Sequence, residues 1–243
     1  GAIPVHGDLR QPARWIDAVE GVDAVIHAAA TFTDDMGAVD HALMDRLLPR
    51  MPAGSALVYT GGCWLYGETG DRVADEETPF DPLPAFAWMV EPIRRVLSAT
   101  GIRGIVVHPA MVFEQGGGVF TRFAEEARHR GRIGIVGGEA VRWPLVHKED
   151  LADLYLRALE RGMAGTAYNG AAIDGLPVGR IARAIAKRLG AIDEPEVRSA
   201  DEIAAELGDW ARGYALDQRM SGDRARRDLG WSPTRTDPLA DPA

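Results

Sequence analysis

The front half of the chain alternates short apolar segments with helix-like segments, and this alternation limits the fold more than any other feature. The predicted strands are dense in Val, Ile or Ala and close on Gly, Pro or a polar residue. They are residues 2–8, 23–30, 55–62 and 103–113. Segments with apolar residues three and four apart are predicted helices, at residues 11–21, 39–51 and 88–101. Apolar strands separated by helices predict a parallel sheet covered on both faces.

The pattern changes after about residue 115. The run "QGGG" is a flexible entry, and "VFTRFAEEARHRG" is a predicted helix. Residues 132–162 are predicted as a strand, a loop and a helix. The tail from residue 171 is predicted to be mostly helical, with Ser221 as the N-cap of its last helix.

Composition limits the partners of the chain. Its 36 acidic residues outnumber 27 basic ones, which argues against a nucleic-acid binder. A lone cysteine, Cys63, excludes an internal disulfide and a cysteine-based metal cluster, and it fits a reducing cytoplasm. No apolar run reaches the roughly 18 residues of a membrane span. We therefore expect a cytoplasmic protein that acts on a small molecule, with no nucleic acid, membrane or metal.

Several motifs occur in a familiar order: "VHGDLRQP", "DAVIHAAA", "LVYTGGCWLYG", "VVHPAMVFEQGGG", "WPLVHKEDLADLYLRAL" and "ARRDLGWSP". Their order and spacing resemble the extended short-chain dehydrogenase/reductase superfamily, also called the NAD-dependent epimerase/dehydratase family. The resemblance implies an α/β fold with a doubly wound, Rossmann-like parallel sheet and a smaller, mostly helical C-terminal part. Residues 1–114 would then form the cofactor-binding part and residues 115–243 mostly the substrate-binding part, with residues 144–170 returning to the sheet.

The resemblance also implies NAD or NADP as cofactor. Asp8 and Leu9 would lie against the adenine, and Ala28, Ala29 and Ala30 would line the pyrophosphate and ribose, with Thr60 nearby. Small side chains suit this place because a bulky one would hold the backbone away from the cofactor. The alternative is that Asp8 caps a turn and the alanines simply pack.

The family begins with a strand, a glycine-rich turn, a helix and a second strand, and the printed sequence starts at the third strand. In the order 3-2-1-4-5-6 the first two strands lie between residues 2–8 and 23–30. We expect about 50 preceding residues in the native protein, from the size of two βα units, and other polypeptide or a gap in that slot. The glycines of "GRIGIVG" are not a substitute, because Pro144 follows and no helix begins there.

The usual catalytic Ser or Thr, Tyr and Lys are absent. Gly62, Leu83 and Ala87 occupy their positions, and none of these side chains exchanges a proton. Tyr66 is the first candidate for a replacement, followed by Glu91 and His108. Each has a structural alternative: a pocket wall, a helix anchor and a packing residue.

The residues expected around the substrate are Cys63, Trp64, Trp88, Arg142, Trp143 and His147. The tryptophans favour an apolar or aromatic substrate. The predicted function is an atypical NAD(P)-binding oxidoreductase or epimerase-like enzyme of this superfamily. The alternatives are a cofactor-free cyclase, isomerase or ligand-binding protein, and a non-catalytic dinucleotide sensor. The sequence leaves open the substrate, the choice between NAD and NADP, and a homodimer.

Overall fold

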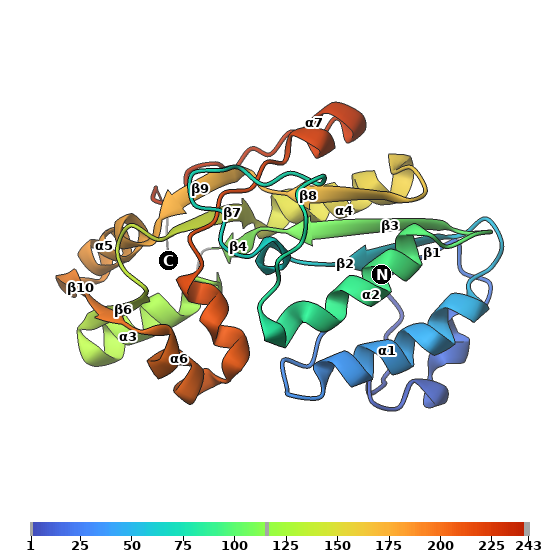
Figure 1. Ribbon diagram of the computed structural model, residues 1–243, viewed down its shortest axis with the longest axis horizontal. Coiled ribbons are helices and arrows are strands. Elements are labelled where there is room, and N and C mark those ends of the chain that lie inside the picture. Colours follow the sequence, from blue (N-terminus) through green and yellow to red (C-terminus); the bar gives the residue numbers. More distant parts are fainter. Residues whose placement is uncertain (1, 115–116, 241–243) are drawn as a thin grey trace.

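A parallel four-stranded sheet forms the centre of the computed structural model, which describes residues 2–114 and 117–240 (Figure 1). Its strands, in spatial order, are β1 (Ala24–His27), β2 (Ala56–Thr60), β3 (Arg103–Pro109) and β8 (Thr166–Gly170). The inner strands β2 and β3 are buried along most of their length, as their continuous apolar sequence predicts. The predicted parallel, Rossmann-like α/β sheet is therefore confirmed.

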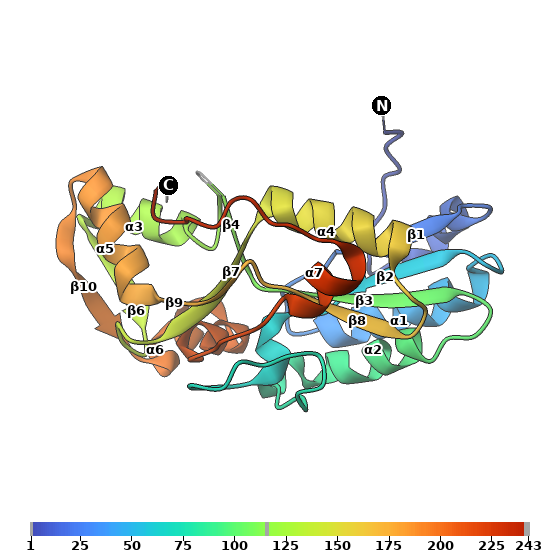
Figure 2. The ribbon, with the colours of Figure 1, turned by 90° about the horizontal axis from the view of Figure 1, so that it is seen from above.

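Helices cover both faces of this sheet (Figures 1 and 2). Helices α1 (Met36–Leu47) and α2 (Val90–Leu97) lie on one face, over a core that includes Leu43, Met44 and Ile93. Helix α4 (Lys148–Arg161) packs on the other face, and α7 (Asp223–Leu229) contacts β8. None of the helices in the described ranges is both long enough and apolar enough to cross a membrane.

Short 3₁₀ turns replace parts of the predicted helices. The segment predicted as a helix at residues 11–21 forms two such turns, η1 (Pro12–Arg14) and η2 (Ile16–Val19). Another, η3 (Leu48–Arg50), follows α1, and η5 (Pro84–Met89) precedes α2. The turns η1, η3 and η5 each have a proline in their first two positions, where its missing N–H costs least.

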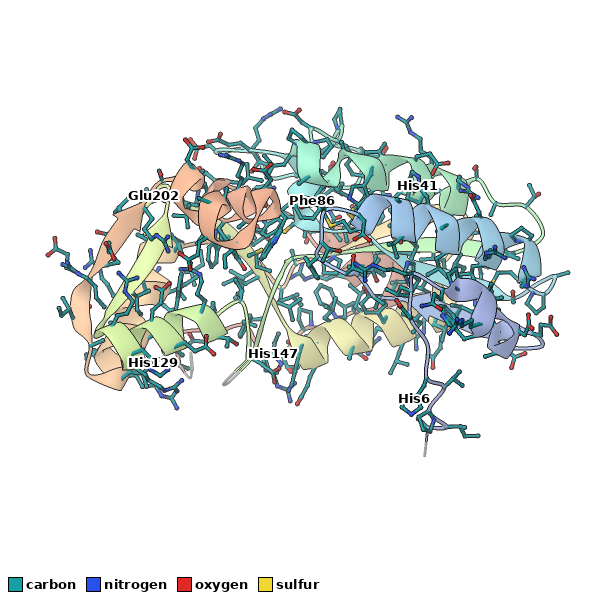
Figure 3. All side chains as sticks on the ribbon, turned by 90° about the horizontal axis from the view of Figure 1, so that it is seen from below. His6, His41, Phe86, His129, His147 and Glu202 are labelled. Carbon is teal, nitrogen blue, oxygen red and sulfur yellow. The ribbon has the colours of Figure 1, made fainter. Side chains whose placement is uncertain are left out.

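Residues 2–8 do not form the predicted strand. Ile3 is 89% exposed, and the segment extends away from the body of the molecule, as the label of His6 shows (Figures 2 and 3). It makes no hydrogen bond to β1, so the two segments are not neighbouring strands, as expected. Within the described residues the outer edge of β1 has no partner, and Ile26 there is 42% exposed. In the described part of the chain no strand lies beside this segment to pair with it, which explains its irregular backbone.

The chain from residue 103 to 114 forms two strands where one was predicted. After Pro109 it leaves the central sheet and continues as β4 (Met111–Glu114). This strand belongs to a second sheet of order β5-β4-β7-β9, with β5 (Gly117–Gly118), β7 (Arg142–His147) and β9 (Ile173–Pro177). Residues 115 and 116 of the predicted flexible entry lie outside the described residues.

The remaining C-terminal elements surround a two-stranded sheet of β6 (Arg132–Val136) and β10 (Ile192–Arg198). They are α3 (Thr121–Arg130), α5 (Val178–Leu189), α6 (Ala200–Leu207) and the 3₁₀ segment η6 (Asp209–Ala215). The tail therefore contains strands β9 and β10 besides its helices. The "GRIGIVG" run is strand β6 with no helix directly after it, as predicted. The N-cap of α7 is Gly222; the hydroxyl of Ser221 accepts from the N–H of Asp223.

The end of the described chain is tied to the start of α4 through the buried side chain of Asp150. Its carboxylate accepts the N–H groups of Thr234 and Arg235, at 3.1 and 2.8 Å. The indole of Trp231 donates to the backbone carbonyl of Asp150 at 2.8 Å. A buried acceptor that satisfies two backbone donors holds this segment against α4.

Replacing this acceptor should destabilise the fold. Asp150→Ala leaves two backbone donors without their partner, so the free energy of unfolding should fall by about 1–3 kcal/mol in urea denaturation. Asp153→Asn is the matched control on the same helix, because Asp153 is part of a partly exposed pair with Arg157. Its effect should stay within about 0.5 kcal/mol. Equal effects of the two variants would contradict the assignment.

Candidate active site

A cavity of about 490 Å³ opens where β1, β2 and β3 end, between the central sheet and the C-terminal half. Its wall comes from the ends of the three strands and the segments that follow them, from the first half of α1, from β4 and β5, and from η5 and η6. Most of the lining side chains are apolar or aromatic. The carboxyl ends of parallel strands are the usual binding edge of such a sheet, so this cavity is the candidate active site.

Aromatic side chains form one side of the cavity. The ring of Trp64 contacts Phe86 at 5.3 Å, Tyr214 at 5.5 Å and Trp210 at 6.3 Å between ring centroids. Phe86 lies where η5 meets the C-terminal half (Figure 3). Phe32, 56% exposed, extends this wall through an edge contact with Trp210 at 5.6 Å. A planar apolar ligand fits such a wall.

The residues predicted to hold a cofactor divide into two groups. Ala28, Ala29, Ala30 and Thr60 line the cavity, and the three alanines are exposed there. Asp8 does not line it: its side chain accepts from the N–H of Arg10, and its carbonyl accepts from the indole of Trp15. Leu9 lines a small adjoining space beside His27 and Ala30. Their contact with a cofactor stays a prediction.

Three of the predicted substrate residues line the cavity, namely Cys63, Trp64 and Trp88. The other three do not, because the segment expected to be a loop is strand β7. Arg142 forms an ion pair with Asp217 at 2.6 Å. Trp143 is buried in the core, where its indole donates to the carbonyl of Tyr214. His147 caps α4 by accepting from the N–H of Glu149.

Tyr66 does not line the cavity. It is buried, and its hydroxyl donates to Oδ1 of Asn169 at 2.8 Å. Burial raises the pKa of its phenol far above the usual range. The prediction of Tyr66 as proton donor therefore lacks support in this geometry, and the residue instead links the segment after β2 to β8.

His108 and Glu91 also lie away from the cavity wall. His108 is 1% exposed, and its Nδ1 accepts from the N–H of Gly62 at 3.3 Å. Burial lowers the pKa of this imidazole to about 4, so it stays neutral at physiological pH. Glu91 lies on the outer side of α2, within 3.5 Å of His41 and 3.7 Å of Arg95. His108 packs in the core and Glu91 lies among surface charges, so the proton-transfer roles of both stay predictions.

Gly62, Leu83 and Ala87, which occupy the positions of the absent catalytic residues, differ in their surroundings. Gly62 lines the cavity, whereas Leu83 and Ala87 do not. The 3₁₀ turn η5 directs Phe86, Trp88 and Met89 to the cavity instead. A Cβ added at Gly62 would have no neighbouring atom within 4 Å, and φ there is 178°, which any residue adopts. The missing hydroxyl at this position is therefore not a steric necessity.

A buried polar group that the sequence reasoning missed lies at the base of the cavity: His27, Asp40 and Tyr59. His27 and Tyr59 end neighbouring strands and are partners in the register of β1 and β2. Asp40 could have been recognised as a buried polar residue from the sequence. It shares the buried face of α1 with Met36, Leu43, Met44 and Leu47, and a carboxylate on such an apolar stripe indicates a buried partner.

Comparison with known proteins identifies the family. The model of the NAD dependent epimerase/dehydratase family matches residues 2–171. The chain belongs to this family. The resemblance inferred from the motifs is thereby confirmed.

Relatives and solved structures agree with this membership. An uncharacterized protein of Schizosaccharomyces pombe is 29% identical over 178 residues, which is 72% of this chain and 58% of the relative. One of Saccharomyces cerevisiae is 32% identical over 117 residues, 47% of this chain and 38% of the relative. This epimerase-family chain thus spans less than two thirds of either curated relative.

Among solved structures, the human epimerase family protein SDR39U1 with NADPH has a TM-score of 0.79 at 20% identity, covering 93% of this chain and 84% of its own. A dTDP-glucose 4,6-dehydratase, DesIV, from Streptomyces venezuelae, with NAD and DAU bound, has a TM-score of 0.78 at 19% identity, covering 95% and 74%. At this identity the two structures support the fold of the family.

The hydroxyl of Tyr66 should matter for stability. Tyr66→Phe leaves Oδ1 of Asn169 unpaired in the core, so the free energy of unfolding in urea should fall by about 1–3 kcal/mol. Tyr168→Phe is the matched control, because that hydroxyl accepts a long bond of 3.4 Å from the N–H of Met163. A smaller loss for Tyr66→Phe than for Tyr168→Phe would contradict the structural role.

The single cysteine gives a second test. Burial raises the pKa of the Cys63 thiol from 9.0 to about 12, which lowers its thiolate fraction near neutral pH by roughly a thousandfold. Iodoacetamide, followed by mass spectrometry, should therefore alkylate the native protein far more slowly than the urea-unfolded protein. Similar rates in both states would show that Cys63 is open to solvent.

Proposed function

We propose that this protein is an NAD(P)-binding oxidoreductase or epimerase-like enzyme that acts on a small aromatic or apolar substrate. The observation that carries the proposal is the aromatic-walled cavity at the carboxyl ends of the parallel strands. Family membership supports the oxidoreductase or epimerase chemistry. Residues 1–114 would hold the cofactor, and residues 115–243 would mostly bind the substrate.

The cavity residues fit a nicotinamide cofactor. Ala28, Ala29 and Ala30 are exposed on the wall, so a ligand reaches their backbone without meeting a large side chain. Thr60 adds a hydroxyl, which shares a hydrogen bond of 2.6 Å with Tyr155. These four residues would hold the cofactor. NAD(P) would supply hydride transfer to or from a substrate carbon.

The substrate class follows from the rest of the wall. Within the described residues the cavity lining contains no Lys or Arg. A phosphorylated or carboxylated substrate would therefore lack an opposite charge in this cavity. Trp64, Phe86, Trp210 and Tyr214 instead offer apolar faces and edges, and these favour an uncharged ring or a compact apolar group.

The proposal is tested with a variant that fills the cavity without straining the backbone. Gly62 lines the cavity, has extended backbone angles and has free space where a Cβ would lie. Gly62→Val should weaken ligand binding at least tenfold, about 1.4 kcal/mol, while the melting temperature stays near that of the parent. NADH and NADPH fluorescence titrations measure the cofactor, and turnover of aromatic alcohols, aldehydes and ketones measures the substrate.

The control is Ala53→Val, since Ala53 is exposed and does not line this cavity. It should leave binding unchanged. Binding of NADPH with equal affinity by the parent and Gly62→Val would contradict this cavity as the site. An intact protein that binds the aromatic compounds but neither NADH nor NADPH would favour the cofactor-free cyclase, isomerase or ligand-binding alternative. Binding of NADPH without turnover of any of these compounds would favour the sensor.

A further inference from the structure

His27 and Asp40 form a buried acid–base pair at the base of the cavity. Nε2 of His27 lies 2.7 Å from Oδ1 of Asp40, and both residues are 8% exposed. The hydroxyl of Tyr59 donates to the other carboxylate oxygen, Oδ2, at 3.0 Å. Tyr59 is 1% exposed. Each oxygen of the Asp40 carboxylate thus has a partner, which fixes the orientation of the group.

This arrangement sets the tautomer of the imidazole. An ionised carboxylate only accepts hydrogen bonds, so the proton of the neutral His27 ring lies on Nε2. Nδ1 is then the basic nitrogen. Within the described part of the chain it has no hydrogen-bond partner. A histidine held by a carboxylate on one side, with its other nitrogen free to accept, is arranged as a general base.

The position of the pair is unusual for a purely structural element. Asp40 occupies one place on the apolar stripe of α1, between Met36 and Leu43. A buried carboxylate is costly to desolvate, and its partners must compensate that cost. Packing alone therefore does not require an acid here. Both members of the pair line the cavity.

The other proton-bearing groups on the wall are weaker candidates. Burial raises the pKa of the Cys63 thiol to about 12, and it also raises the pKa of the Tyr214 phenol. The Tyr59 hydroxyl already donates to Asp40. Thr60 shares its hydroxyl with Tyr155, whose pKa burial raises to about 12. These groups are either engaged or hard to ionise, whereas Nδ1 of His27 has no partner among the described residues, which makes His27 the best placed group.

We propose that His27, oriented by Asp40, is the residue that exchanges a proton with the substrate, in place of the absent tyrosine and lysine. The inference rests on the proposed function. For an alcohol substrate, the O–H bond breaks and its electron pair stays on oxygen, while the proton forms an N–H bond at Nδ1 of His27. Asp40 stabilises the resulting imidazolium. In the reverse direction the carbonyl carbon would accept a hydride from NAD(P)H, and the imidazolium returns the proton to the resulting alkoxide oxygen. Asp40 is a positioning residue.

The turnover number of two variants tests the roles of His27 and Asp40. His27→Gln should lower kcat by about 10²–10⁴-fold with KM within a few-fold, because proton transfer is lost while the cavity keeps its size. Asp40→Asn keeps the shape of the side chain and should lower kcat in the same direction, which guards against misfolding of the first variant. The matched controls are His129→Gln and Asp45→Asn, both on exposed surfaces. They should leave kcat unchanged.

Two turnover outcomes overturn the inference. One is an unchanged kcat in a folded His27→Gln variant. The other is a loss of kcat that appears only in Thr60→Val, which would assign the proton to the hydroxyl pair of Thr60 and Tyr155. Circular dichroism melting confirms the fold of each variant.

A readout without turnover separates this inference from the proposed function. In protein labelled with ¹⁵N-histidine, NMR should show His27 protonated on Nε2 and unprotonated on Nδ1, and benzyl alcohol should shift the Nδ1 resonance. Asp40→Asn should abolish the tautomer preference. Protonation on Nδ1, or no shift with benzyl alcohol, overturns the inference. If Nδ1 shifts but no NADPH binds and no compound turns over, the oxidoreductase function fails while His27 remains the proton acceptor of the cavity.

Discussion

The fold depends on two places, side by side, where the chain passes from the central sheet into the second sheet. Strand β3 pairs with β8 up to Pro109 and Gly170, and there both segments of the chain leave the central sheet. The N–H of Ala110 donates to the carbonyl of Gly170 at 3.1 Å, which holds the two departing segments together. They continue towards β4 and β9 of the second sheet. Because both crossings occur at the carboxyl ends of the strands, the C-terminal half is fixed beside the edge where ligands bind.

The sequence predicted the central sheet, strand β6 and the helices of the second half, and it missed strands β7, β9 and β10 there. Buried parallel strands have continuous apolar sequences, so residues 55–62 and 103–109 were recognisable by composition alone. The strand β10 was not, because "IDEPEVR" is polar, half exposed and depends on pairing with β6. A short exposed strand is defined by its neighbour more than by its own residues.

The same distinction applies to the site. Ala28, Ala29, Ala30, Thr60, Cys63 and Trp64 directly follow or end predicted strands, so the topology alone places them at the cavity. Arg142, Trp143 and His147 do not line the cavity because residues 142–147 form strand β7 of the second sheet, where a loop was expected. His27 and Tyr59 were missed because their contact exists only through the pairing of β1 with β2, and strand register is not visible in one sequence.

Phe32 is the only described residue other than glycine with positive φ, at 50°. A left-handed backbone costs a bulky residue on the order of 1–3 kcal/mol, and the surroundings must hold it in place. The contact with Trp210 joins this strained loop to the C-terminal half across the rim of the cavity. The loop between β1 and α1 is anchored beyond that point, where Arg10 binds Asp35 and Thr33. If the Phe32 ring left Trp210, the backbone at Phe32 would also relax. The free energy needed to open the rim is therefore lower than the loss of the aromatic contact alone would require.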